Sequence, residues 1–229
     1  MESYIRHPKH GPLPALLLVM TIVTGVVDAV SILTLGRVFV ANMTGNIVFI
    51  AFAVVGTPGF SLYASLAALA GFLVGAAAGG RMIGLTTHRG RLLRNSAIAE
   101  LVLLVAALIL VLVVNHPNEP VRDMVAFLIA VAMGGQNAVV RKLAVPDLTT
   151  TVLTMTLTGI VADIRTASYD VAIRRALAVL CMFGGAALGA VLVLHVHPAA
   201  ATGVAVALMA IVAIGATLAC RHPAPWQEP

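Results

Sequence analysis

Charged residues are scarce in this chain of 229 residues. Lysine and arginine together number 14 and aspartate and glutamate 9, so charged side chains make up only 10% of the sequence, whereas apolar residues make up 60%. An ordinary globular chain carries about 25% charged residues, and so few charges cannot cover the surface of a body this apolar. The scarcity excludes a soluble enzyme, a disordered chain and a coiled coil.

Cysteine is also scarce, and the apolar runs lack the alternation of a β-barrel. The two cysteines, Cys181 and Cys220, lie within apolar runs, so we expect small buried side chains rather than a disulfide framework. Continuous apolar runs predict an all-α polytopic membrane protein whose partner is the lipid bilayer. The net charge of +5 does not indicate nucleic acid as a partner, because the basic residues lie in short segments between apolar runs.

Eight apolar stretches follow one another along the chain, and two of them are poor membrane spans. A span needs about 20 apolar residues. The stretch 38–56 begins with polar residues, and the stretch 148–163 is short and rich in threonine. The other six stretches are the predicted spans, at residues 13–35, 61–85, 92–114, 121–140, 172–195 and 199–220.

The basic residues decide between six and eight spans, because cytoplasmic segments are rich in lysine and arginine. If all eight stretches span, each side carries seven basic residues. If 38–56 and 148–163 instead enter and leave on the same side, twelve lie inside and two, Arg37 and Arg122, lie outside. The sequence therefore predicts six spans and two re-entrant half-helix segments, with cytoplasmic tails at 1–12 and 221–229.

Short motifs recur at a separation of about 110 residues: Gly75-Ala-Ala-Ala-Gly79 corresponds to Gly185-Ala-Ala-Leu-Gly189, and Thr44 corresponds to Thr154. The matches predict two repeats, 13–114 and 121–220, each made of a span, a re-entrant segment and two further spans. Because three spans is an odd number, the second repeat is expected to be inverted, as in many secondary transporters.

Glycines at four-residue spacing predict faces on which helix backbones approach closely. Helix packing is the favoured interpretation of these faces, and a homodimer or a sliding face between the repeats are the alternatives. The glycines concerned are Gly71, Gly75 and Gly79 in the first repeat and Gly185 and Gly189 in the second.

Two carboxylates at membrane depth are candidates for proton coupling, because a charge there costs about 2.5–3.5 kcal/mol on insertion scales. Asp28 in the first span is either a coupling or substrate-binding residue, or a cap for the re-entrant backbone. Glu100 in the third span is either a second coupling residue or the partner of a nearby arginine, Arg94 or Arg81; the pairing is the favoured alternative.

Polar clusters in both repeats predict a central substrate site. Half-helices that begin at the midplane would direct their positive N-termini toward one point, which favours a small anionic or polar solute. Asp28 would then be protonated or paired, which makes proton coupling natural. The predicted substrate-binding residues are Asp28, Asn42, Thr44, Gly45, Asn46, Gln136, Asn137, Thr150, Thr151, Thr154 and Thr156.

No cofactor, metal site or enzymatic activity is predicted. His195 and His197 have no carboxylate or cysteine near them in the sequence and form a poor ligand set. The chain also lacks H-E-x-x-H, G-x-S-x-G and Walker sequences, so no hydrolase or nucleotide site is indicated.

Several of the motifs named above resemble the YoaK family of bacterial inner-membrane proteins. They are Gly25-Val-Val-Asp28-Ala29, Phe39-Val-Ala-Asn-Met-Thr-Gly-Asn46, Gly135-Gln-Asn-Ala138 and Asp147-Leu-Thr-Thr-Thr-Val-Leu-Thr154. The resemblance implies a location in a bacterial inner membrane and about six spans, but no substrate. In one departure, the second repeat has Thr154-Met155 where the family pattern leads us to expect Thr-Gly.

The leading functional hypothesis is a small secondary transporter or permease with a central site between the repeats. A non-transporting membrane scaffold or regulatory subunit is one alternative, although a scaffold has little use for paired polar clusters at depth. A channel is another alternative, but it would need a continuous polar stripe through the spans.

Overall fold

The computed structural model describes residues 10–114, 118–163, 169–221 and 224–227, which form helices and loops without strands. The prediction of an all-α polytopic membrane protein is confirmed, because six of the described helices are long and apolar enough to span a membrane. Most of the predicted N-terminal tail and part of the C-terminal tail lie outside the described residues, as do Arg6, Lys9 and Arg165. The six long helices are α2 Leu13–Thr34, α4 Leu62–Leu85, α5 Arg89–Val113, α6 Glu119–Leu143, α8 Tyr169–His195 and α9 Pro198–Ala219.

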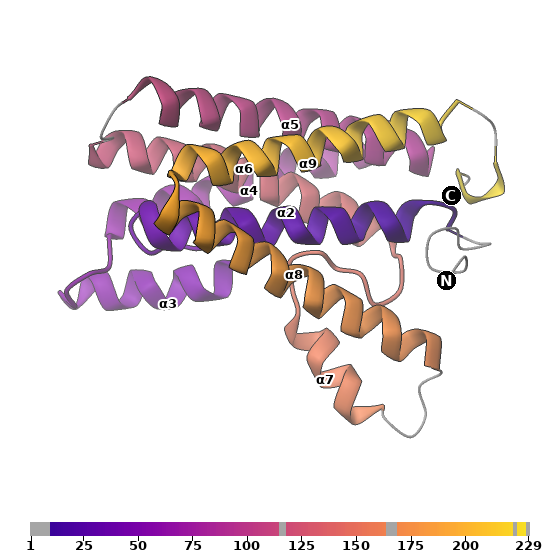
Figure 1. Cartoon of the computed structure of the whole chain (residues 1–229), viewed down its shortest axis with the longest axis horizontal. Helices are drawn as coiled ribbons and strands as arrows, with labels where there is room; N and C mark the ends of the chain where they lie inside the picture. Colours follow the sequence, from indigo (N-terminus) through magenta and orange to yellow (C-terminus); the bar gives the residue numbers. More distant parts are fainter. Residues whose placement is uncertain (1–9, 115–117, 164–168, 222–223, 228–229) are drawn as a thin grey trace.

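Two shorter helices, α3 Met43–Val54 and α7 Thr154–Ala162, lie within the two stretches that were predicted to be re-entrant. A short 3-10 helix, η1, covers Pro225–Gln227. Each short helix follows a non-helical segment, 35–42 before α3 and 144–153 before α7. Both lie on one side of the bundle, α3 and α7 extending toward opposite ends of it (Figure 1). The polar residues at the start of each stretch therefore end up in or beside the non-helical segments.

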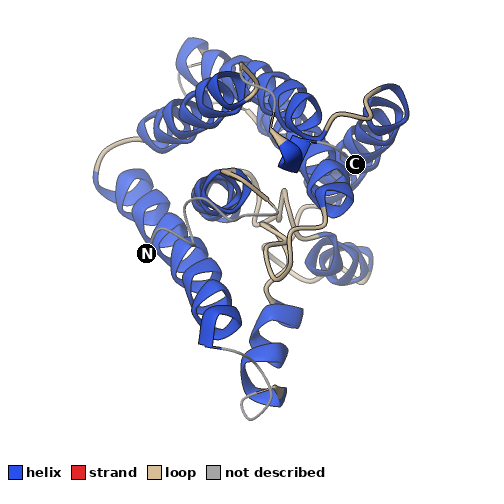
Figure 2. Cartoon of the chain, turned by 90° about the vertical axis from the view of Figure 1, so that its right-hand side faces the viewer, coloured by secondary structure: helices blue, strands red, loops and turns tan. Residues whose placement is uncertain are grey.

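The segment between α2 and α4 begins and ends at the same end of the bundle. Leu35, just after α2, and Ser61, just before α4, line one cavity together with Glu119 at the start of α6. The segment between α6 and α8 does the same at the opposite end, where Arg175 Nε donates to Asp147 Oδ1 at 2.8 Å. Viewed along the bundle, the long helices surround α2 and the loops that lead to α7 (Figure 2).

The two halves of the chain pack in corresponding ways. When α2, α3, α4 and α5 are matched with α6, α7, α8 and α9, the extensive contact of α4 with α6 corresponds to that of α8 with α2, and α5 packs on α9. Burial also corresponds: Ala41 and Asn46 are buried at the start of α3, as Thr151 and Thr156 are at the start of α7. The spacing of 110 residues found in the motifs therefore recurs in packing.

The glycines singled out in the sequence lie where helix backbones touch within the chain. A Cβ on Gly75 would collide with the Val131 carbonyl oxygen, and one on Gly185 would collide with that of Ile22. Helices α4 and α6 also meet at Gly134, where a Cβ would collide with the Phe72 carbonyl oxygen. Because these backbones are in direct contact, only glycine fits.

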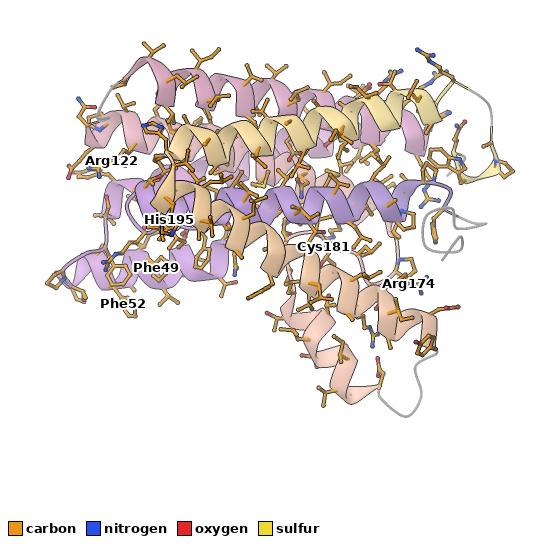
Figure 3. The ribbon with its side chains drawn as sticks, viewed as in Figure 1. Phe49, Phe52, Arg122, Arg174, Cys181 and His195 are labelled. Carbon is orange, nitrogen blue, oxygen red and sulfur yellow. The ribbon has the colours of Figure 1, made fainter. Side chains whose placement is uncertain are left out.

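Basic residues gather at the end of the bundle that carries both termini. Among the described residues, Arg37 and Arg122 lie at the other end, and Figure 3 shows Arg122 and Arg174 at opposite ends. This distribution matches the charge count that predicts a cytoplasmic location for the end with the termini.

We therefore expect single cysteines introduced at Arg91 and Pro58 to label from opposite sides of the membrane. In a chain without Cys181 and Cys220, a membrane-impermeant maleimide added to intact cells should label the cysteine at Pro58 and spare the one at Arg91 until the membrane is opened. Labelling of Arg91→Cys in intact cells would reverse the orientation, and labelling of both would contradict the six-span topology.

Candidate functional site

A polar cluster is buried between four elements of the bundle. It consists of Thr24 on α2, Glu100 on α5, Gln136 on α6 and Thr150 in the segment before α7, and none of these residues is more than 2% exposed. The hydrogen-bond network assigns the orientation of the Gln136 amide: Nε2 lies 2.7 and 3.1 Å from the two Glu100 carboxylate oxygens, and Oε1 lies 2.8 Å from Thr150 Oγ1 and 3.2 Å from Thr24 Oγ1. Gln136 thus connects a buried carboxylate to the non-helical segment.

Glu100 does not form the ion pair that the sequence favoured. Among the described residues it is bonded to Gln136, and Arg94 instead donates to the Asn95 side chain at 3.0 and 3.2 Å. Arg94 precedes Glu100 by six residues, which places the two side chains on different faces of α5. Beside Glu100 lies a cavity of about 60 Å³, bounded also by Ser96 and Gln136, which has room for water.

Thr150 adopts an unusual backbone conformation next to this cluster. Its φ is +59°, which a β-branched residue rarely adopts. Such strain persists where the surroundings fix the residue, and the buried bond to Gln136 is the contact that does so. A change at the Glu100–Gln136 pair would therefore act directly on the segment that leads to α7.

The first-half cluster fixes the segment that leads to α3. Asp28 Oδ1 accepts from the backbone N–H groups of Val40 and Ala41, each at 3.4 Å. Asn46 Oδ1 accepts from the Phe39 N–H at 2.9 Å, and its Nδ2 donates to the Phe39 carbonyl at 2.6 Å. The bonds to Val40 and Ala41 agree with the second of the two predicted roles of Asp28, as a cap for non-helical backbone, and its coupling or substrate-binding role stays a prediction.

Asn137 on α6 fixes the segment that leads to α7, as Asp28 on α2 fixes the segment that leads to α3. Its Nδ2 donates to Thr151 Oγ1 at 2.9 Å. Arg175 on α8 adds a second contact to this segment: it donates to Asp147 at 2.8 Å and to the Gly159 carbonyl of α7 at 2.5 Å. Sequence reasoning missed Thr24, although it lies one helical turn before Asp28, a spacing that places both on one face.

The remaining predicted residues lie apart from both hydrogen-bonded clusters. Asn42, Thr44 and Thr154 are exposed, at the first turns of α3 and α7, and the Asn42 side chain makes no capping bond. Thr156 is buried, at 5% exposure. The structure therefore divides the predicted site into residues that fix the backbone, a buried carboxylate centre, and open polar positions at two helix N-termini.

The surroundings of Gly45 explain why the second repeat has Met155 where the family pattern leads us to expect glycine. A Cβ on Gly45 would lie 2.6 Å from the Phe39 ring, which stacks on Phe49 with ring centroids 5.8 Å apart. Figure 3 shows Phe49 on α3. In the second repeat Thr149 takes the place of Phe39, and Met155 is 73% exposed. Because the Met155 side chain is mostly exposed and Thr149 has no aromatic ring, glycine is not required at position 155.

Asn46 and Asn42 offer a matched test of this arrangement. Asn46→Ala leaves the half-buried N–H and carbonyl of Phe39 without their partner, and each such group costs up to about 1–3 kcal/mol. We expect the free energy of unfolding to fall by about 2–5 kcal/mol, measured by denaturant titration in detergent micelles. Asn42→Ala removes an exposed side chain without a cap bond and should change it by less than about 0.5 kcal/mol. Equal losses in the two variants would contradict the assignment.

The described residues contain no group of three histidine, cysteine, aspartate or glutamate side chains that could hold a metal ion. Cys181 and Cys220 are both free and partly buried. The residues of the site can supply hydrogen bonds, helix-terminus electrostatics and proton exchange at the two carboxylates.

Comparison with known proteins places these residues in a family without an assigned activity. The family described as "Protein of unknown function (DUF1275)" matches residues 16–215. The UPF0700 transmembrane protein YoaK of Bacillus subtilis (strain 168) is 34% identical over 152 residues, which cover 65% of this chain and 66% of that relative, just under two thirds of its length. No solved structure matches. The resemblance to the YoaK family is confirmed.

Proposed function

This chain belongs to the DUF1275 family of membrane proteins of unknown function, and we propose that it is a small secondary transporter in which two inverted repeats enclose a polar centre. The observation that carries the proposal is the buried Glu100–Gln136 pair, which is bonded to the non-helical segment before α7. A carboxylate at membrane depth is costly and marks ion or proton pathways.

The corresponding packing of the two halves supports the inverted arrangement. Each half supplies three long helices. Because three is an odd number, the second half starts on the opposite side of the membrane from the first. The contacts of α4 with α6 and of α8 with α2 both join one half to the other. Two similar halves that meet on equivalent faces can exchange conformations, which opens one site to either side in turn.

The open polar positions support a small anionic or polar solute. Asn42, Thr44 and Thr154 lie at the first turns of α3 and α7, where backbone N–H groups lack helical partners. The positive end of a helix dipole attracts anions. In this proposal Asp28, Asn46 and Asn137 position the two helices, and the exposed residues contact the solute.

Glu100 is the proposed proton-coupling residue, because the cluster can form a complete network in either protonation state. With a carboxylate, Gln136 Nε2 donates to Glu100, and Thr24 and Thr150 donate to Gln136 Oε1. With a carboxylic acid, Glu100 donates to Gln136 Oε1, and the reversed amide donates to Thr150 Oγ1 at 2.8 Å and Thr24 Oγ1 at 3.2 Å. Thr24 is then free to donate to the Met20 carbonyl at 3.0 Å. Protonation of Glu100 thus changes the group that Gln136 presents to the strained Thr150, from an accepting oxygen to a donating nitrogen.

Uptake into proteoliposomes tests the proposal. Nitrate and lactate serve as anions, choline as a cation and glycerol as a neutral solute. We expect saturable uptake of an anionic or neutral probe that falls at least ten-fold in Glu100→Gln and is unchanged in Glu119→Gln, whose exposed carboxyl lies at the end of the bundle. Uptake without saturation would favour a channel, uptake of choline alone would contradict the anion assignment, and no uptake of any probe would favour a scaffold.

A further inference from the structure

A further cavity, remote from the polar centre, opens at the end of the bundle that carries the termini. It has a volume of about 500 Å³ and lies between the end of α4, the start of α5 and the end of α6. Its charged lining residues are Arg89 and Lys142, and its apolar wall includes Ile83, Leu92 and Leu143. Because three predicted spans begin or end here, the cavity lies at the level where lipid headgroups meet the hydrocarbon.

The charge around this cavity has one sign. The segment 81–94 contains four arginines and no acidic residue, and Arg141 and Lys142 end α6. Arg89 is held in place, because it donates to the Leu143 carbonyl at 2.6 Å. Lys142 is exposed and forms no ion pair with a described residue. A fixed guanidinium and an exposed ammonium above an apolar wall match an anionic headgroup with its acyl chain.

The cavity at the opposite end provides an internal comparison. It has a similar volume of about 420 Å³, but its charged lining residues are Glu119, Arg122 and Asp123. Arg122 lies 3.9 Å from Glu119, so this cavity has more acid than base. Two cavities of similar size at the two ends of the bundle therefore differ mainly in charge.

We propose that the cavity between α4, α5 and α6 binds one anionic phospholipid, with Lys142 and Arg89 at its phosphate and Ile83, Leu92 and Leu143 along its acyl chain. The site is independent of the proposed transport activity. Thr86 and Thr87, which also line the cavity, supply neutral donors to the headgroup. The bound lipid would join the ends of α4 and α6, which belong to different halves of the chain.

Native mass spectrometry of the purified full chain tests this site. Phosphatidylglycerol and phosphatidylcholine with the same acyl chains are added to the detergent-solubilised protein. A basic residue near an anionic surface contributes about 1 kcal/mol, so Lys142→Gln should weaken phosphatidylglycerol binding about five-fold. Arg91→Gln removes one charge from the same end of the bundle outside the cavity lining and should change it less than about two-fold.

A second variant and a competitor distinguish other origins of binding. Lys142→Glu should weaken phosphatidylglycerol binding further than Lys142→Gln while leaving the thermal unfolding midpoint close to that of the original chain. Equal losses in Arg91→Gln and Lys142→Gln would indicate diffuse surface attraction and overturn the proposal. Equal binding of phosphatidylcholine, or displacement of the lipid by glycerol phosphate at equal concentration, would also overturn it.

Discussion

Gly75→Ala should destabilise the chain more than any other single methyl group added to α4. The new Cβ would collide with the Val131 carbonyl oxygen of α6, and backbone atoms cannot move away as a flexible side chain can. Overpacking of this kind costs about 1–3 kcal/mol and sometimes more. We expect a loss of free energy of unfolding at or above the upper end of that range, measured by denaturant titration in detergent micelles.

Gly80→Ala is the matched control in the same helix. Nothing lies within 4 Å of the Cβ that it would add, and alanine is favoured over glycine in a helix by about 0.5–1 kcal/mol. The two substitutions should therefore have opposite signs. Gly185→Ala and Gly184→Ala form the corresponding pair in α8, because Gly185 lies against the backbone of α2 and Gly184 does not. A stable Gly75→Ala variant would contradict the close packing of α4 on α6.

Glu100→Gln should abolish proton exchange at the buried centre while leaving the fold intact. Glutamine has nearly the same shape and can still bond to Gln136, so the free energy of unfolding should change by less than about 1 kcal/mol. Infrared difference spectra across a pH titration should contain a buried-carboxyl signal in the original chain that is missing from the variant.

Glu100→Ala separates this role from a packing role. Alanine leaves a cavity and removes the acceptor for Gln136, and an unpaired buried amide costs about 1–3 kcal/mol in addition to the lost packing. We therefore expect Glu100→Ala to be clearly less stable than Glu100→Gln. A carboxyl signal that persists in Glu100→Gln but disappears in Asp28→Asn would transfer the coupling role to Asp28.

The long helices and the glycine faces could be predicted because they depend on local patterns. Apolar runs of membrane length determine the six spans, and charge placement demoted the two stretches that became α3 and α7. The match of Gly75 with Gly185 at a separation of 110 residues reappears as corresponding backbone contacts with Val131 and Ile22. Periodicity and spacing are properties of the sequence itself, so these features needed no knowledge of which helices meet.

The partner of Glu100 could not be predicted, because it depends on which helices become neighbours. Glu100 and Gln136 are on different helices, and no motif connects them. Reasoning along the chain favoured Arg94 or Arg81, which were expected near Glu100 at the inner surface but are not bonded to it in the fold. Thr24 was missed for the same reason: its role arises from α2 lying against Gln136. Tertiary contacts between distant residues create the centre.

Proton movement driven by solute is the most direct test of a coupled transporter centred on Glu100. Proteoliposomes containing a pH-sensitive dye would receive, from outside, the probe that the uptake experiment identifies. We expect a solute-dependent change of internal pH with the original chain and with Glu119→Gln, and none with Glu100→Gln. An unchanged pH response in Glu100→Gln, or solute uptake without any proton movement in the original chain, would contradict it.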